Sequence, residues 1–274
     1  MAILMAVLSG ILEGITEWLP ISSTGHLLLL NRVLKLPMSA AATELFQVVI
    51  QLCAMVAVLI IFWRKLAPFG GQIQEERRKI YGLWGKTLLA TLPAAVIGLL
   101  LDDWLTAYLY RPLVVAGALI LYGVAFVLLE KWRKSNPFRG FLVENSEDIA
   151  PKTALGIGCF QLLSLVPGTS RSGATVLGGM LLGLSRPAAA EFSFFLGLPT
   201  MLGAGLLKGA KFVLEGNRLT AEEGILIAVG GAVAFFTSLA VIRFLMDFVR
   251  RHSFVGFGVY RILLGAAVIA ASLV

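Results

Sequence analysis

Two short polar segments interrupt an otherwise apolar sequence, and they hold the residue types that could do chemistry. The first, from Glu13 to His26, contains two glutamates, a run of serine and threonine hydroxyls and a histidine. The second, from Pro167 to Thr175, contains hydroxyl side chains, two glycines and an arginine. Carboxylates, hydroxyls and an imidazole are the groups of nucleophilic and acid–base catalysis, and an arginine among hydroxyls suits an oxyanion.

The two carboxylates of the first segment, Glu13 and Glu17, are four residues apart and lie on one face if the segment is helical. An ionisable side chain inside a membrane is costly, and two like charges are worse. The pair therefore shares a cation, holds a proton or faces a basic partner. We expect an acid pair associated with a metal or a phosphate, with a purely structural salt bridge as the alternative.

The hydroxyls of the first segment follow directly. Pro20 should break the helix, so that Ser22, Ser23 and Thr24 lie on a loop and His26 opens the next helix. An imidazole beside serines and carboxylates can serve as general base for a nucleophile, and the spacing allows Ser23 and His26 to meet across one turn. A structural histidine is the alternative.

The second segment has the composition of an anion-binding loop. Its glycines let the backbone approach a ligand closely, Arg171 offers a planar fork for phosphate oxygens, and the next helix would point its first N–H groups at the same place. An arginine that only neutralises a buried glutamate is the alternative. A nucleotide is not expected, because no Gly-Lys-Ser/Thr follows a strand. The candidate phosphate ligands are Ser22, Thr24, Gly168, Thr169, Ser170, Arg171, Ser172 and Thr175.

The composition places these motifs in a membrane. The 274 residues are 58% hydrophobic and 14% charged, with a mean hydropathy of +0.88, whereas a soluble domain has about 25% charged residues. Lipid must therefore be the main solvent. The net charge of +7 comes largely from basic residues in short loops between apolar runs, which is a membrane topology signal and does not indicate nucleic acid.

The apolar pattern predicts an all-α integral membrane protein of six spans and two interrupted segments. The expected spans are residues 44–63, 86–101, 112–129, 188–207, 224–245 and 254–274. Residues 3–34 and 153–184 each contain two short apolar helices around a polar, Pro/Gly-rich break. The second helix of each pair, starting at 26 and 174, is too short to cross, which favours re-entrant hairpins. Residues 44, 47 and 51 share one face of the first span and serve either to support the site or to link helices.

The two halves of the chain have the same plan. Pro20 and Pro167 are 147 residues apart, as are Glu44 and Glu191, and the loop motifs align without a gap. We expect one membrane domain made of repeat one, residues 1–135, and repeat two, residues 150–274, joined by a cytoplasmic loop. Because each repeat holds three spans, the second must be inverted, as in transporters whose site lies between the halves.

Basic loops predict the orientation. Residues 64–86, 131–152 and 243–251 fall on one side of a six-span chain and are rich in lysine and arginine, so this side is cytoplasmic. Both termini then lie outside. Residues 208–218 would also lie outside despite three basic residues. His252 is expected to be a solvated loop residue.

The motifs are recognisable as those of a known family. The strings Glu13-Gly-Ile-Thr-Glu-Trp-Leu-Pro-Ile-Ser-Ser-Thr-Gly-His26 and Pro167-Gly-Thr-Ser-Arg-Ser-Gly-Ala-Thr175 resemble the signatures of the undecaprenyl-pyrophosphate phosphatases of the bacitracin-resistance type, over essentially the whole chain. The resemblance implies removal of the terminal phosphate of undecaprenyl diphosphate, which regenerates the carrier lipid for peptidoglycan and counters bacitracin. It also implies a divalent cation, Mg²⁺ or Ca²⁺, and a bacterial inner-membrane location with the site facing the periplasm.

Carried over by position, the resemblance makes Glu13 and Glu17 the acidic pair and candidate metal ligands. It makes Ser23 and His26 the catalytic hydroxyl and imidazole, and Arg171 the phosphate-binding group with Ser170 and Ser172. Our preferred hypothesis is attack by Ser23, activated by His26, with direct attack by His26 as the alternative. The rival function is a transporter or flippase of polyprenyl phosphate lipids. Expected partners are the lipid substrate and membrane lipids, without nucleic acid; a homodimer is left open.

Overall fold

The computed structural model describes residues 1–33, 36–69, 73–135 and 142–273, and within these ranges the regular structure is helical, with no strand beyond one isolated bridge. Six described helices are long and apolar enough to cross a membrane. They are α3 (Ala40–Ile61), α5 (Gln74–Leu109), α6 (Pro112–Ser135), α9 (Arg186–Leu214), α10 (Ala221–Arg251) and α11 (Val255–Leu273). The predicted all-α class and the six spans are confirmed.

The spans extend further than hydropathy predicted. The predicted loop 64–86 is largely helical, because α4 (Trp63–Leu66) follows α3 and α5 already begins at Gln74. The first turn of α5 carries Glu75 and Glu76, which favour a helix N-terminus, and Glu75 pairs with Lys79 one turn on at 4.0 Å. Hydropathy marks only the apolar part of such a helix, so its charged start was missed.

Four short helices carry the two motifs. The first motif joins α1 (Ala2–Thr16) to α2 (Ser23–Val33), and the second joins α7 (Pro151–Gln161), through the 3₁₀ helix η2 (Leu162–Leu165), to α8 (Arg171–Leu181). Both breaks lie where the prolines predicted them. The second helices begin earlier than expected, at residues 23 and 171, because a serine caps each one.

The two capping serines have the same local structure. Ser22 and Ser170 both have positive φ, 73° and 70°, and each hydroxyl accepts a hydrogen bond from a glycine N–H three residues on, at 3.4 Å for Gly25 and 3.2 Å for Gly173. The caps are 148 residues apart, so the gap-free alignment of the two loops is wrong by one residue here. The second loop needs one more residue between its proline and its cap.

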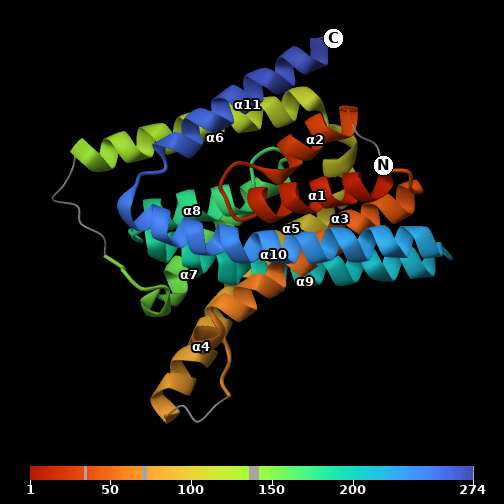
Figure 1. Ribbon diagram of the computed structural model, residues 1–274. Helices are drawn as coiled ribbons and strands as arrows, with labels where there is room; N and C mark the ends of the chain where they lie inside the picture. The colour runs from red at the N-terminus through yellow and green to blue at the C-terminus, as the bar shows by residue number, and fades with distance from the viewer. Residues whose placement is uncertain (34–35, 70–72, 136–141, 274) are drawn as a thin grey trace.

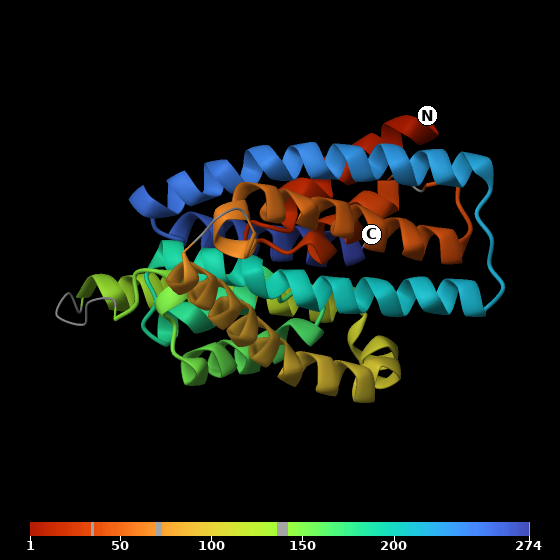
Figure 2. The same cartoon turned by 90° about the horizontal axis from the view of Figure 1, so that it is seen from below.

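The motif helices pack against the long helices (Figures 1 and 2). The first motif helix, α1, packs on α10, while α7 of the second motif packs on α5. α3 lies against both α9 and α10, and α6 pairs with α11. Large aromatic side chains fill the core around these contacts, among them Trp18, Phe46, Phe126, Phe192, Phe194 and Phe195.

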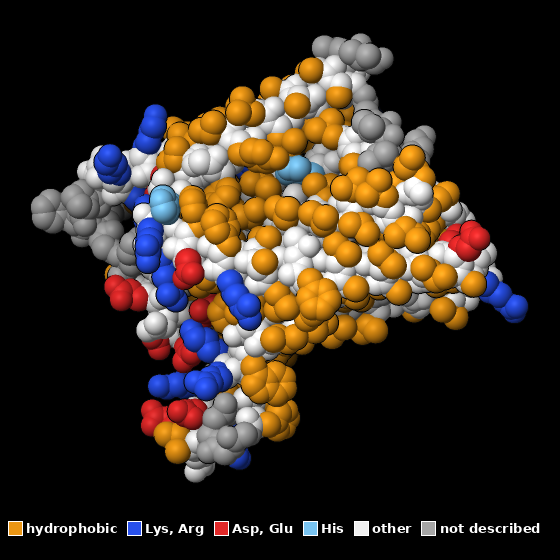
Figure 3. Space-filling model, viewed as in Figure 1, with side chains coloured by type: hydrophobic (Ala, Val, Ile, Leu, Met, Phe, Trp, Pro, Cys, Tyr) orange, Lys and Arg blue, Asp and Glu red, His pale blue; other side chains and the backbone are white. Residues whose placement is uncertain are grey.

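The outer surface is largely apolar (Figure 3). Hydrophobic side chains cover most of the visible face, and most charged side chains gather towards one end, opposite the end where the N-terminus lies. Large apolar residues such as Leu100, Leu206 and Phe236 are two-thirds or more exposed. A surface of this kind is stable only in lipid, which agrees with a multi-pass membrane protein.

Two glycines set the close approach of α6 and α11, and they provide a stability prediction. A Cβ on Gly123 would lie 2.6 Å from the carbonyl oxygen of Gly258. Gly123→Ala should therefore lower the free energy of unfolding by about 1–3 kcal/mol, the usual cost of overpacking. The measurement is thermal or denaturant unfolding in detergent. Gly117→Ala is the matched control on the same helix, because its Cβ would meet nothing within 4 Å; equal loss in both variants would contradict the prediction.

Candidate active site

The two motifs meet although they are far apart in sequence. Arg171, the first residue of α8, reaches back to Glu17 at the end of α1, with 3.0 Å between Nη2 and Oε1. The Ser172 hydroxyl donates to the backbone carbonyls of Glu17 and Leu19, at 3.1 and 3.3 Å. Both side chains of the ion pair are at least nine-tenths buried. The structure therefore brings the acidic motif and the arginine motif into one site.

Glu17 is the centre of this site. Its Oε2 accepts from the Ser23 hydroxyl at 3.5 Å and from the Gln51 amide at 3.3 Å, while Oε1 faces Arg171. Gln51 on α3 thus supports the site, as one interpretation of that helix face predicted. Glu44 of the same face instead pairs with Lys208 of α9 at 2.8 Å, which agrees with the other interpretation, a link between helices.

The Arg171 guanidinium is held but not fully satisfied. Besides Glu17, it donates through Nη1 to the carbonyl oxygen of Ser193, at 2.5 Å. Its Nε is buried and has no hydrogen-bond partner among the residues that the structure describes. A buried donor without a partner is rare and needs an explanation, for which a bound ligand is one. Gly197 makes room for the guanidinium, because a Cβ there would lie 2.7 Å from Nη1.

Glu13 lies one turn before Glu17 and is 3% exposed. Among the described residues, no hydrogen bond or ion pair reaches its carboxylate, and no group of three or more histidine, cysteine or acidic side chains could hold a metal by itself. A buried carboxylate beside a second one fits a hard cation such as Mg²⁺ or Ca²⁺, which prefers oxygen ligands. Such a cation would need further oxygens from water or from a phosphate.

His26 is held at both ring nitrogens. Nδ1 lies 2.7 Å from the backbone carbonyl oxygen of Ser22, and Nε2 lies 2.7 Å from the hydroxyl of Tyr260 on α11. The two rings are also stacked, with centroids 5.6 Å apart. The contact between Ser23 and His26 that the spacing allows is not among the described hydrogen bonds, because the Ser23 hydroxyl turns back to Glu17 and the imidazole turns towards α11.

A second residue of α11 joins the two motif loops. Arg261 is fully buried and donates to the carbonyl oxygens of Pro20 at 3.0 Å, Gly168 at 3.0 Å and Thr169 at 2.8 Å. Sequence reasoning missed Tyr260 and Arg261 because α11 was interpreted as a plain span. The missed signal was the arginine itself, since a charge inside a span requires partners.

Several candidate phosphate ligands of the second motif form hydrogen bonds within the protein that stabilise the loop. The Thr175 hydroxyl bonds Ser193 Oγ at 2.7 Å, and the Ser170 and Ser172 hydroxyls bond each other at 3.1 Å. Gly168 has φ of +94°, and a Cβ there would lie 2.4 Å from the carbonyl oxygen of Val115, so packing against α6 already requires this glycine. These contacts fix the loop shape that presents the backbone and Arg171.

Strain marks both loops. The non-glycine residues with positive φ in the described ranges are Ser22 and Ser170, one in each motif. Such conformations cost of the order of 1–3 kcal/mol and gather at functional sites. Here, each is maintained by the helix cap that the serine forms. A cavity among the described residues lies elsewhere, away from both loops.

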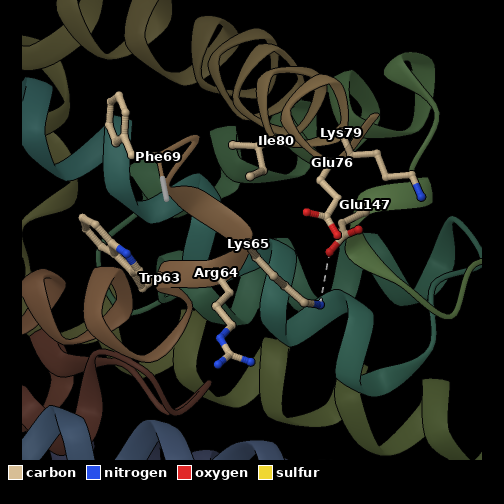
Figure 4. A pocket seen from close by; sticks show the side chains of 8 residues that line it. All are labelled: Trp63, Arg64, Lys65, Phe69, Glu76, Lys79, Ile80 and Glu147. Carbon is tan, nitrogen blue, oxygen red and sulfur yellow. Dashed lines mark ion pairs between the residues drawn. The ribbon is translucent and has the colours of Figure 1, made fainter. Parts of the chain in front are cut away.

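That cavity, of about 550 Å³, opens between α4 and the start of α5 (Figure 4). Its lining residues are Trp63, Arg64, Lys65, Phe69, Glu76, Lys79, Ile80 and Glu147, and none belongs to either motif. Lys65 pairs there with Glu147 at 3.6 Å. It also pairs with Glu191, outside the lining, at 2.7 Å. Because no lining residue belongs to a motif, we place no catalysis in this cavity.

Comparisons with known proteins agree on one family. The family described as "Bacitracin resistance protein BacA" matches residues 6–267 of the chain. A protein of Enterococcus faecalis named undecaprenyl-diphosphatase is 49% identical over 265 residues, covering 96% of this chain and 95% of that protein. Proteins of the same name are 48% identical in Streptococcus thermophilus, covering 97% and 92%, and in Lactiplantibacillus plantarum, covering 97% and 96%. The chain is similar to each over nearly its full length.

Proposed function

Because the chain belongs to the bacitracin resistance protein BacA family and is an undecaprenyl-diphosphatase, we propose that its two motifs form the single site of this hydrolysis. The reaction converts undecaprenyl diphosphate and water to undecaprenyl phosphate and phosphate. The observation that carries the assignment of the site is the buried contact between Glu17 and Arg171, which unites acids, hydroxyls and a phosphate-binding cation. The monophosphate produced is the carrier lipid for cell-wall synthesis.

We propose that Arg171 binds the diphosphate. Its unpartnered Nε is a buried donor ready for a phosphate oxygen, and the N–H groups at the start of α8 point at the same region. Substrate oxygens can also replace the Glu17 carboxylate at Nη2. Phosphoryl transfer needs mainly positioning and charge stabilisation, and a fixed arginine provides both.

We propose that the Ser23 oxygen is the nucleophile. It attacks the terminal phosphorus, the bond to the bridging oxygen breaks, and undecaprenyl phosphate leaves with that oxygen. The hydroxyl proton has an acceptor in place, because Glu17 Oε2 is 3.5 Å from Ser23 Oγ. Glu17 thus takes the part first given to His26.

His26 then acts in the second step. Water attacks the phosphoserine and its proton passes to the imidazole, while the bond between phosphorus and the Ser23 oxygen breaks. The departing Ser23 oxygen takes back the proton that Glu17 holds, which restores both groups, and phosphate leaves. Nε2 can do this because Nδ1 is already occupied by the Ser22 carbonyl. In the rival version Nε2 attacks phosphorus directly and forms a phosphohistidine.

A divalent cation completes the proposal. Glu13 and Glu17 would hold Mg²⁺ or Ca²⁺, which when bound supplies positive charge against the diphosphate oxygens. Their burial on one helix face and the lack of a described partner for Glu13 support this assignment.

Removal of the cation is the corresponding prediction. EDTA should abolish phosphate release by the purified protein, and added Mg²⁺ or Ca²⁺ should restore it. Glu13→Gln should raise the cation concentration for half-maximal turnover by at least about 10-fold, the loss expected when a ligand environment is disturbed. Glu44→Gln is the control, since Glu44 is exposed and paired with Lys208. Full turnover in EDTA, or an unchanged requirement in Glu13→Gln, would contradict the assignment.

The test of the function itself is phosphate release from undecaprenyl diphosphate in detergent or in vesicles. Release that saturates with substrate and fails in Arg171→Ala supports the proposed site. Full phosphate release by that variant would show that the two motifs do not form the active site.

We propose that the motif segments are re-entrant hairpins within an inverted repeat. Reciprocal packing supports this: α1 lies on α10 and α7 on α5, so each hairpin packs on a span of the other half. Reciprocal ion pairs support it too, since Glu44 of α3 pairs with Lys208 of α9, while Glu191 of α9 pairs with Lys65 beyond α3. We also propose that the site opens to the periplasm, because α1 enters from the end opposite the charged loops.

A further inference from the structure

We propose that Tyr260 is a positioning residue of the hydrolysis: its hydroxyl fixes the tautomer and direction of the His26 imidazole. The inference rests on the proposed role of His26. It adds a residue from α11, which lies outside both motifs, and it predicts which ring nitrogen reacts.

The hydrogen-bond chemistry determines the tautomer. The Ser22 carbonyl oxygen, 2.7 Å from Nδ1, can only accept, so Nδ1 must carry the proton. In the neutral ring Nε2 then has the free electron pair. The Tyr260 hydroxyl, 2.7 Å from Nε2, must be the donor in that contact. The two partners together select one neutral tautomer, and stacking of the rings at an interplanar angle of 11° limits rotation.

The neighbouring residue makes Tyr260 a fixed support. Arg261 is fully buried, and its guanidinium binds the carbonyls of Pro20, Gly168 and Thr169. This part of α11 is therefore tied to both motif loops. Tyr260 points from the same turn to His26, so the imidazole has a constant place relative to Ser23 and Arg171.

The reacting nitrogen follows from this arrangement. Nε2 faces the tyrosine hydroxyl, and an incoming water can exchange for that hydroxyl without a change of tautomer. Without the hydroxyl, only the Ser22 contact is left to hold the ring. When the ring turns away from that carbonyl, either nitrogen can carry the proton. The imidazole would then accept a proton less often, although substrate would bind as before.

The kinetic test is Tyr260→Phe, which keeps the ring and removes the hydroxyl. We expect kcat to fall by about 10- to 100-fold, as when the hydrogen-bond partner of a functional imidazole is removed, while KM for undecaprenyl diphosphate stays within about 2-fold. Tyr110→Phe is the control, because Tyr110 is 64% exposed and lies outside both motifs in the sequence. It should have normal turnover. Normal kcat in Tyr260→Phe would overturn the proposal.

A spectroscopic test separates positioning from a general loss of structure. The chain has two histidines, so His252→Gln leaves His26 as the single imidazole. His252 is exposed and stacks on Phe248, and its loss should leave activity intact. In this background, ¹⁵N NMR should show a protonated Nδ1 and an unprotonated, hydrogen-bonded Nε2. Tyr260→Phe should mix the tautomers.

The outcomes distinguish the two proposals. An unchanged ¹⁵N signature in Tyr260→Phe would overturn the positioning role even if kcat fell. If His26→Ala kept full turnover, the catalytic role of His26 would fail, and the ¹⁵N signature would still report whether Tyr260 holds the ring. A tautomer change together with a lower kcat and constant KM supports the proposal.

Discussion

Ser23→Ala should lower undecaprenyl diphosphate hydrolysis by about 10⁴-fold or more, the scale of loss when the nucleophile of a covalent mechanism is removed. The fold should survive, because the Ser23 hydroxyl makes one weak hydrogen bond, at 3.5 Å to Glu17. Phosphate release by purified protein in excess Mg²⁺ is the measurement. Thr16→Ala is the control on the neighbouring helix, since its hydroxyl donates to the Leu12 carbonyl within that helix.

A trapped intermediate sharpens this prediction. Brief reaction with substrate labelled in the terminal phosphate, followed by denaturation, should leave label on the protein that survives acid and is lost in alkali, as phosphoserine does. Label that is lost in acid and survives alkali would identify a phosphohistidine. Near-normal turnover of Ser23→Ala, with none in His26→Ala, would likewise exclude the serine nucleophile.

Arg171→Ala should lower turnover by about 10³- to 10⁵-fold, the range that an arginine contributes to phosphoryl transfer. The guanidinium is the only described cation in contact with Glu17, and it offers the buried Nε to substrate. Arg171→Lys should fall between wild type and alanine, because a lysine keeps the charge and loses the fork. The measurement is kcat/KM for phosphate release.

Stability must be separated from chemistry here. Removing Arg171 leaves Glu17 buried and unpaired, which costs about 3–5 kcal/mol in broken buried pairs. Arg186→Lys is the matched control: Arg186 binds both Glu130 oxygens, at 2.7 and 2.5 Å, away from the motifs. It should lower the melting temperature with little loss of turnover. A comparable loss of turnover in both lysine variants would show that Arg171 matters only for folding.

Much of this structure could be predicted because a helix that crosses lipid needs a long apolar run, which is easily seen in the sequence. Spans of apolar residues and breaks at Pro20 and Pro167 predicted six long helices and two interrupted ones. The charged start of α5 was missed, since its helix is made by local propensity and ion pairs that hydropathy does not record.

The detailed site could be predicted only in part. Motif spacing indicated Glu13, Glu17 and Arg171, and the structure places the last two in contact. The orientation of Ser23 could not be predicted, because it depends on the positive φ at Ser22, which starts α2 three residues early. Tyr260 and Arg261 lie more than 230 residues from the first motif, and only tertiary packing brings them to it.

In the proposed site, Glu17 and phosphate compete for the guanidinium of Arg171. In the resting site the Glu17 carboxylate lies 3.0 Å from Arg171 and neutralises its charge, so the guanidinium attracts other anions less strongly. We expect a diphosphate that binds Nη2 as well as Nε to exchange with the carboxylate there, which would weaken ground-state binding. The same exchange runs in reverse after hydrolysis, when Glu17 reclaims Arg171 and the released phosphate loses its strongest partner. The ion pair that joins the two motifs thereby favours product departure and readies the site for the next lipid.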